Sequence, residues 1–158
     1  MANITNVCLY CPPGSKGDTG VCVTNNYAYA ANTTGASITL SLISPTYNIP
    51  LPSKELSSYI TANGNNDEFT ISNAGTYYIK YQIYTTSSLL LNTRLIINGS
   101  GNTASTVSPV VSLSSFSSEV IVDLTENSTV SLQIFGLLGV VAIPSGSCGA
   151  SLTIIRLA

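Results

Sequence analysis

Hydrophobic and polar residues alternate along most of the chain after residue 25, with the period of two that is typical of β-strands. The segment ASITLSLI, residues 36–43, sets Ile38, Leu40 and Leu42 against serine and threonine. Such runs are short, rich in Val, Ile, Thr and Tyr, and separated by clusters of turn residues. Since no long window has the period of a helix, the pattern predicts an all-β chain, built as a β-sandwich or jelly roll.

Asparagine and glycine divide the remaining runs, as expected for the tight turns of β-hairpins. The final run reaches the end of the chain without a turn signal. The predicted elements are two strands within 68–87 separated by Asn73-Ala74-Gly75, a strand in 89–100 that ends at Asn98-Gly99, two strands within 117–136 separated by Glu126-Asn127, and a last strand in 150–158.

A different pattern occupies the first 24 residues. Residues 1–11, MANITNVCLYC, resemble an extended arm, and PPGSKGDTG follows with glycine at every third position. Chance would give about 0.07 such glycine runs in a chain of this composition. A flexible linker is the alternative, but only glycine fits the crowded axis of a collagen triple helix, so the run predicts three associated chains. The residues of this short collagen-like neck are Pro12, Pro13, Gly14, Gly17 and Gly20.

These patterns divide the chain into three parts. Residues 1–11 form the predicted connector arm, residues 12–24 the neck, and residues 25–158 a single β-domain long enough for its own core. No stretch reaches the ~18 apolar residues of a membrane helix, and the N-terminus lacks the features of a secretory signal. We therefore expect no membrane partner and no export by the ordinary secretory route.

Charged residues make up only 8% of the chain, against about 25% in ordinary domains. The net charge of -2 gives no reason to expect a nucleic-acid partner. A monomer with so few charges would be poorly protected against association. The composition therefore predicts a chain that buries surface on several sides, in an oligomer or a fibre.

Catalysis is not expected, because the chain has no histidine and no nucleophile motif. No cofactor is expected either. Asn65, Asn66, Asp67 and Glu68 have the oxygen atoms that calcium prefers. The same residues suit an exposed turn before a strand, which is the favoured interpretation.

The four cysteines are Cys8, Cys11, Cys22 and Cys148. Zinc bound by all four is one possibility, but their spacing is unlike a zinc ribbon or finger. A redox-active pair formed by Cys8 and Cys11 is another possibility. Disulfide cross-linking between chains is favoured, and the connectivity stays open because four cysteines allow three pairings even within one chain.

Three segments resemble a known family. FTISNAGTYYIKYQI (69–83) and LNTRLIINGS (91–100) are similar to the central strands of the tumour-necrosis-factor and complement-type trimeric jelly rolls. GASLTIIRLA (149–158) resembles the last strand of the BclA-type collagen-like glycoproteins that coat bacterial endospores. The resemblance covers about 130 residues. This chain differs from BclA-type proteins in two respects, because those proteins carry a long collagen-like region and a proline-rich leader that are not seen here.

This resemblance implies a homotrimer of jelly rolls around a threefold axis, with the collagen-like stalk entering at the base. It also implies that the first and last strands are antiparallel neighbours. The loop 137–150 then lies at the opposite end, the apex. Aromatic residues expected in the core or at the trimer axis are Tyr77, Tyr78, Tyr81 and Phe135.

On this geometry we predict a fibre in which the arms of one trimer insert into the apex of the next. A disulfide from Cys8 or Cys11 to Cys148 would lock each joint. The predicted arm residues are Ile4, Val7 and Leu9, and the predicted apex residues are Leu137, Leu138, Val140, Val141 and Ile143.

The predicted function is therefore a structural subunit of a spore-surface appendage. The subunit is expected to assemble in the mother cell, with itself and an anchoring protein on the spore surface as partners. The alternative is a short BclA-type exosporium glycoprotein or tip trimer that acts in adhesion or ligand binding.

Overall fold

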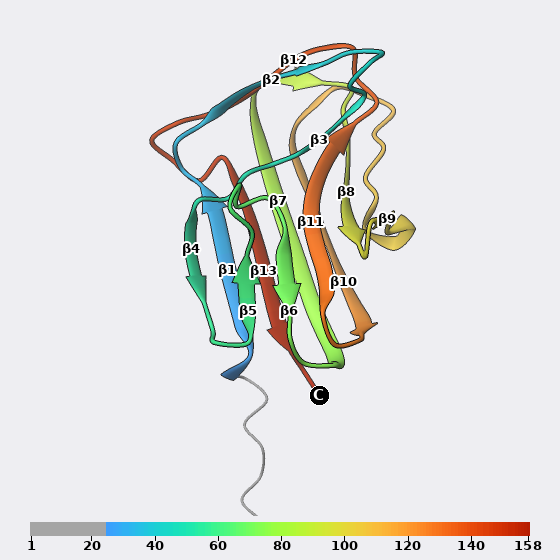
Figure 1. The fold of residues 1–158 in the computed structure, drawn as a ribbon. Coiled ribbons are helices and arrows are strands. Elements are labelled where there is room, and N and C mark those ends of the chain that lie inside the picture. Colours follow the sequence, from blue (N-terminus) through green and yellow to red (C-terminus); the bar gives the residue numbers. More distant parts are fainter. Residues whose placement is uncertain (1–24) are drawn as a thin grey trace, which may run out of the picture.

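Two antiparallel β-sheets pack face to face and form the body of the protein (Figure 1). The structure is a computed structural model that describes residues 25–158. The predicted arm and neck lie outside the described residues. The order of strands in the first sheet is β10 (Leu113–Leu124), β7 (Gly75–Leu89), β13 (Ala150–Arg156), β1 (Tyr27–Asn32) and β4 (Ser53–Leu56).

The second sheet is built around β11, which pairs with strands on both of its sides. A separate two-stranded ribbon crosses one end of the sandwich. The strand order of the second sheet is β5 (Ile60–Ala62), β6 (Phe69–Ile71), β11 (Ser128–Phe135), β8 (Asn92–Ile97) and β9 (Ser100–Gly101), with β3 (Thr46–Asn48) also on β11, and the ribbon, called the apical ribbon below, is β2 (Ala36–Leu40) with β12 (Gly139–Ile143).

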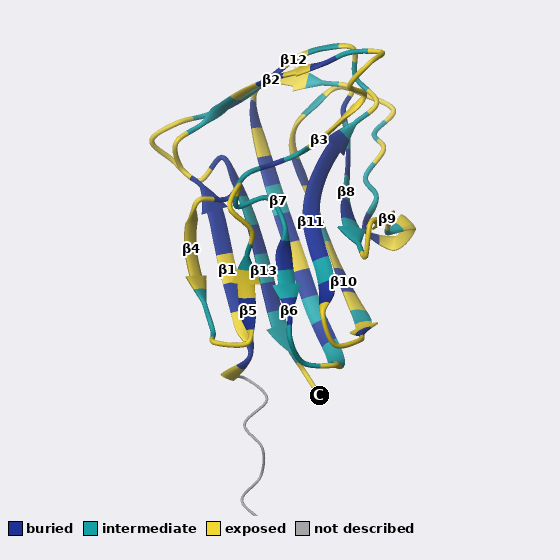
Figure 2. Cartoon of the chain, viewed as in Figure 1, coloured by how far each residue is buried: buried dark blue, intermediate teal, exposed yellow. Residues whose placement is uncertain are grey.

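The core lies between the sheets because alternate residues of each strand point inward. On β7 the inward side chains of Tyr77, Ile79, Tyr81 and Ile83 are fully buried, whereas Lys80 between them is exposed. Figure 2 shows this alternation as changing colours along β7. The prediction of an all-β sandwich is therefore confirmed, and the segment between β9 and β10 contains a short 3-10 turn, η2 (Thr103–Ser105).

Both ends of the described chain lie at one end of the sandwich, the base (Figure 1). This follows from pairing, because β1 and β13 are antiparallel and aligned from Tyr27 with Ile155 to Asn32 with Ala150. The prediction that the first and last strands are antiparallel neighbours is thus confirmed. The apical ribbon and the loops near it occupy the opposite end, the apex.

Most predicted turns are found where the sequence signals them. Asn98 and Gly99 both have positive φ angles, of 51° and 76°, as a two-residue type I′ turn requires. Asn127, with φ 63°, turns the chain between β10 and β11. Strands β6 and β7 end and begin on either side of Asn73-Ala74. Short polar residues at these positions tolerate the left-handed conformation, which makes the signal reliable.

Two predicted boundaries were wrong. The strand expected over 36–43 ends at Leu40, because Ser41 and Ser44 close a turn through a backbone hydrogen bond of 3.0 Å before Pro45. The segment 137–150, expected to be a loop, contains β12, whose backbone pairs with β2. The first of these changes leaves Leu42 and Ile43 on a loop, 84% and 97% exposed.

Tyr81 is a buried polar group at the centre of the core. Its hydroxyl lies 2.8 Å from the hydroxyl of Thr93 and donates to the carbonyl of Ser105 at 2.7 Å. Removing the hydroxyl leaves both partners buried, and such groups cost about 1–3 kcal/mol when unpaired. We therefore expect Tyr81→Phe to lower the free energy of unfolding by about that amount, measured by urea titration at equal chain concentration.

Tyr59→Phe is the matched control, because Tyr59 is 43% exposed on the turn between β4 and β5. It should change stability by no more than about 0.5 kcal/mol. Burial also raises the pKa of Tyr81 to about 12, above its ordinary value of 10.0. Folding therefore favours the neutral phenol, and this part of the stability should be lost as pH rises through about 12 in the parent protein but not in Tyr81→Phe. Equal alkaline losses in both would contradict this account.

Candidate assembly surfaces

Several segments at the apex, where the chain turns between strands, carry exposed apolar side chains. They come from four segments that are far apart in the sequence: the turn after β2, the end of β7, the connection from η2 to β10, and the segment from Leu138 into β12. Isolated exposed apolar residues are normal, but a group of them marks an interaction site. This apical patch comprises Leu42, Ile43, Leu90, Val110, Val111, Leu138 and Val140.

The structure divides the predicted apex residues into two groups. Leu138 and Val140 are 64% and 56% exposed, and Leu137 is half-buried against the core. Val141 and Ile143 are core residues, only 0% and 4% exposed. This corrects the prediction for these two, because β12 alternates its side chains between the core and the surface. They help to hold the apical ribbon on the sandwich and are not available to an arm.

Most residues of the apical patch are not evident from the sequence. Leu42 was assigned to a strand, and Ile43, Leu90, Val110 and Val111 were not singled out. A usable signal was present in the adjacent apolar pair Val110-Val111, which follows Pro109 in a segment without alternation. Only the fold brings these residues to one end of the molecule.

Cys148 lies at the apical end of β13, in the exposed segment before that strand. Its sulfur is 3.8 Å from the hydroxyl of Tyr29 on β1. That hydrogen bond, followed by burial, raises the pKa of Tyr29. The thiol is thus accessible close to the edge of the apex. Cys8, Cys11 and Cys22 lie outside the described residues, as do Ile4, Val7, Leu9 and the neck from Pro12 to Gly20.

The outer face of the first sheet is a second surface with unusual composition. The register aligns Tyr27, Ile155, Tyr78 and Ile121 in one row across four strands near the base. Tyr27 and Ile121 are 40% and 66% exposed. The next row toward the apex contains Lys80, paired across strands with Glu119. An aromatic and aliphatic row of this kind suits contact with another protein surface.

The predicted aromatic residues separate into three environments. Tyr77 and Tyr81 are fully buried in the core, as expected. Tyr78 belongs to the outer face of the first sheet. Phe135 lies on the outer face of the second sheet, where the guanidinium of Arg94 stacks 4.3 Å above its ring.

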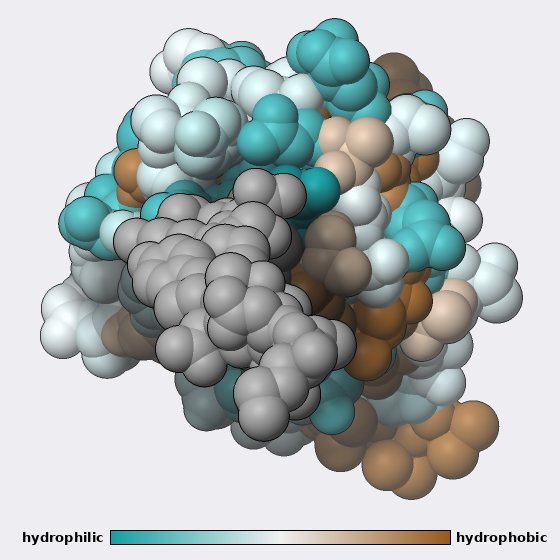
Figure 3. All heavy atoms as spheres, turned by 90° about the horizontal axis from the view of Figure 1, so that it is seen from below, coloured by the Kyte–Doolittle hydropathy of each residue, from teal (hydrophilic) through white to brown (hydrophobic). Residues whose placement is uncertain are grey.

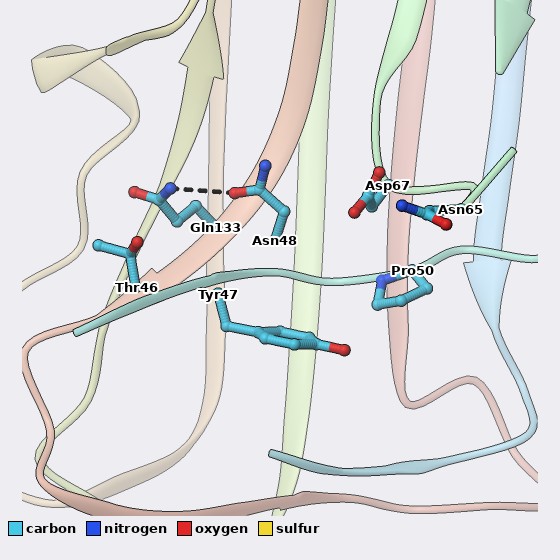
Figure 4. A pocket seen from close by; sticks show the side chains of 7 residues that line it. All are labelled: Thr46, Tyr47, Asn48, Pro50, Asn65, Asp67 and Gln133. Carbon is cyan, nitrogen blue, oxygen red and sulfur yellow. Dashed lines mark hydrogen bonds between the residues drawn. The ribbon is translucent and has the colours of Figure 1, made fainter. Parts of the chain in front are cut away.

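A polar hollow of about 600 Å³ opens on the outer side of the second sheet, between β3 and the loop that joins β5 to β6 (Figure 4). Gln133 lines this hollow and is held by hydrogen bonds to two neighbours. Its carbonyl oxygen accepts from Arg94, and its amide donates to Asn48 at 3.0 Å. The lining residues are Thr46, Tyr47, Asn48, Pro50, Asn65, Asp67 and Gln133.

The loop that contains the possible calcium ligands, Asn65 to Glu68, folds as an exposed turn. Asn63 accepts from the backbone amides of Asp67 and Glu68, and its amide donates to the carboxylate of Asp67 at 2.6 Å. Within residues 25–158, no group of three or more cysteine or acidic side chains is placed to hold a metal ion. The same part of the chain contains no helix long enough and apolar enough to cross a bilayer.

Solved structures of the tumour-necrosis-factor class share this fold. Murine APRIL aligns with a TM-score of 0.60 and 14% identity, over 84% of this chain and 98% of that one. Eiger TNF from S. frugiperda aligns with a TM-score of 0.54 and 12% identity, over 84% and 91%. GITRL from bushbaby aligns at 0.53 and 12%, over 84% and 94%. The protein therefore has a jelly-roll fold like that of these structures, as predicted.

A family model places the chain more specifically than the fold does. Residues 28–158 match the model of the BclA C-terminal domain, so the chain belongs to that family. No curated protein matches the sequence. The family match confirms the resemblance seen in the sequence and supports a structural or ligand-binding role at the spore surface.

Two adjacent residues test the assignment of the apical patch. Val141→Ser should lower the free energy of unfolding by about 2 kcal/mol or more, because it leaves a cavity and buries a hydroxyl. Val140→Ser should change it by no more than about 0.5 kcal/mol, since this side chain is exposed. Equal effects of the two substitutions in urea titrations would show that the ribbon does not alternate as described.

Proposed function

We propose that the protein is the structural subunit of a spore-surface fibre, in which homotrimers stack head to tail. The arm of residues 1–11 inserts into the apex of the next trimer, and the neck of residues 12–24 leads it out of the base. The observation that carries this proposal is the apical patch, which lies at the end of the sandwich opposite the chain's entry.

The trimer forms through the outer face of the first sheet. Three copies that meet on this face would bury the row that contains Tyr27, Tyr78, Ile121 and Ile155 near the base, where a collagen-like neck of three chains would leave the molecule. Seen from below, brown apolar side chains gather mainly on one side of the base rather than evenly around it (Figure 3). A surface with this few charges is also suited to burial.

The apical patch is the socket for the arms. Seven exposed apolar side chains on each of three subunits would be an aggregation hazard if they stayed uncovered. The arm is long enough to reach a neighbouring trimer, because 11 extended residues span roughly 35 Å and the nine residues from Gly14 to Cys22 add roughly 28 Å. Ile4, Val7 and Leu9 provide matching apolar side chains.

The joint is closed covalently by Cys148. Its exposed thiol lies at the apical end of β13, and an incoming arm carries Cys8 and Cys11. Pairing between subunits fits an accessible thiol better than pairing within one chain, whose arm starts from the base. A head-to-tail contact along a threefold axis does not close, so it produces a filament. An anchoring protein on the spore surface would hold one end.

Deletion of residues 2–11 is expected to leave soluble trimers and no fibres. Negative-stain electron microscopy would detect the filaments, and light scattering would give the mass of the soluble species. Fibres that persist without the arm would contradict its role. Monomers in place of trimers would contradict the trimer model.

The socket is tested by Val140→Asp, which places a charge in the apical patch. We expect the loss of fibres with retention of trimers, because a buried unpaired carboxylate opposes arm insertion. Tyr59→Asp is the control, since Tyr59 is 43% exposed on the turn between β4 and β5, away from the apex. Normal fibres from Val140→Asp would remove the apical patch from the joint.

Cys148→Ser tests the covalent lock. Filaments of this variant should form but dissociate in hot detergent without reductant, whereas parent filaments should resist until a reductant is added. Unchanged resistance of the variant would assign the stability to packing alone.

A further inference from the structure

On the outer face of the first sheet, the row beside the aromatic and aliphatic row carries opposite charges. This charged row runs from β4 at one edge of the sheet to β10 at the other. An acidic residue lies at each edge and a lysine lies between them, and all three side chains are exposed. The strand register aligns Glu55, Tyr29, Thr153, Lys80 and Glu119 in this row.

The lysine of the charged row has no counter-charge within its own chain. Lys80 forms no hydrogen bond and no ion pair within residues 25–158, although Glu119 is its direct neighbour on the next strand. The hydroxyl of Tyr78 instead donates to Oε2 of Glu119 at 2.6 Å. Water solvates the ammonium group in a single chain, but burial in a subunit contact would be costly without a counter-charge.

We propose that Lys80 of each subunit forms an ion pair with Glu119 of the next subunit in the trimer. This inference rests on the trimer contact proposed above, and it names the residues that align that contact. The partner at this surface is a second copy of the same chain.

The positions of the two charges suit a threefold contact. Such a contact is heterologous, so it joins two different parts of the subunit surface. Glu119 lies on β10, the outermost strand of the sheet, whereas Lys80 lies one strand further in, on β7. When the β10 edge of one subunit packs against the sheet face of the next, an acid meets a lysine. The surface is therefore complementary in charge to a second copy of itself.

The apolar residues of the face favour the β10 edge over the β4 edge. The aromatic and aliphatic row reaches β10 with Ile121, which is 66% exposed. Beyond β1 the chain continues instead with Ser57, whose hydroxyl accepts from the backbone amide of Tyr27 at 3.1 Å. Burial of apolar area drives association, so β10 is the edge expected in the contact. The acid that reaches the neighbour is then Glu119 and not Glu55.

An ion pair at this position would make the contact specific. Lys80 is the one cation among the residues of β1, β7 and β10. The tyrosine, isoleucine, serine and threonine side chains around it could pack in more than one alignment. Opposite charges favour one alignment, and the others leave a charge buried without a partner.

Sedimentation velocity of the full-length chain with a reductant present tests the proposal. We expect Lys80→Glu and Glu119→Lys each to dissociate at chain concentrations about tenfold or more above those of the parent, because like charges then meet at every contact. An equimolar mixture of the two variants should recover trimers, since most contacts in a mixed trimer join opposite charges again. A pair within one chain would give no such recovery, because each variant keeps its own two like charges.

Glu55→Lys is the matched control, since it makes the same change of charge in the same row at the opposite edge. It should sediment like the parent. Far-UV circular dichroism would verify that all variants are folded. If a reversal variant fails to fold, Glu119→Gln takes its place, and it should still weaken the trimer because Lys80 then lacks a counter-charge.

Parent-like trimers from both reversal variants would overturn the ion pair and leave the trimer contact standing. Recovery in the double variant Lys80→Glu with Glu119→Lys, but not in the mixture, would also overturn it, because the pair would then lie within one chain. Dissociation of Glu55→Lys in place of Glu119→Lys would assign the contact to the other edge and overturn it as well. Monomers from the parent would contradict the proposed trimer itself, which separates the two failures.

Discussion

The pairing of β1 with β13 is the constraint on which the rest of the structure depends. Six consecutive residues of each strand align, and β4 and β7 extend the sheet on either side. Since the two strands run in opposite directions, the chain must enter and leave at the same end. The turn after β2, the end of β7 and the start of β12 lie at the other end. One antiparallel contact thus gives the subunit two different ends.

A subunit with different ends is suited to polymerisation in one direction. A contact between the base of one molecule and the apex of the next repeats indefinitely, whereas a contact between like ends stops at a pair. The two sheets add a second distinction. The first has an outer face with an aromatic and aliphatic row, and the second has an outer face with a polar hollow. The two outer faces of the sandwich therefore differ in their chemistry.

Local signals in the sequence predicted the architecture well. Strands such as β7 were found because inward residues alternate with outward ones, and turns such as Asn98-Gly99 were found because few residues accept positive φ. Strand β1 was not singled out, since its inward residues are the alanines Ala28 and Ala30, which give a weak hydrophobic signal. Strand β12 resembles a loop in the sequence because two glycines, Gly136 and Gly139, interrupt the apolar run.

The sequence by itself determined the fold class, the positions of the main turns and the family, because each depends on residues close together along the chain. Only the tertiary structure decided which apolar residues are core and which are surface. Val140 and Val141 are chemically identical neighbours, and their exposure differs because β12 packs one face on the sandwich. The apical patch and the hollow likewise combine residues from distant segments. Such sites depend on long-range strand pairing, which no local pattern encodes.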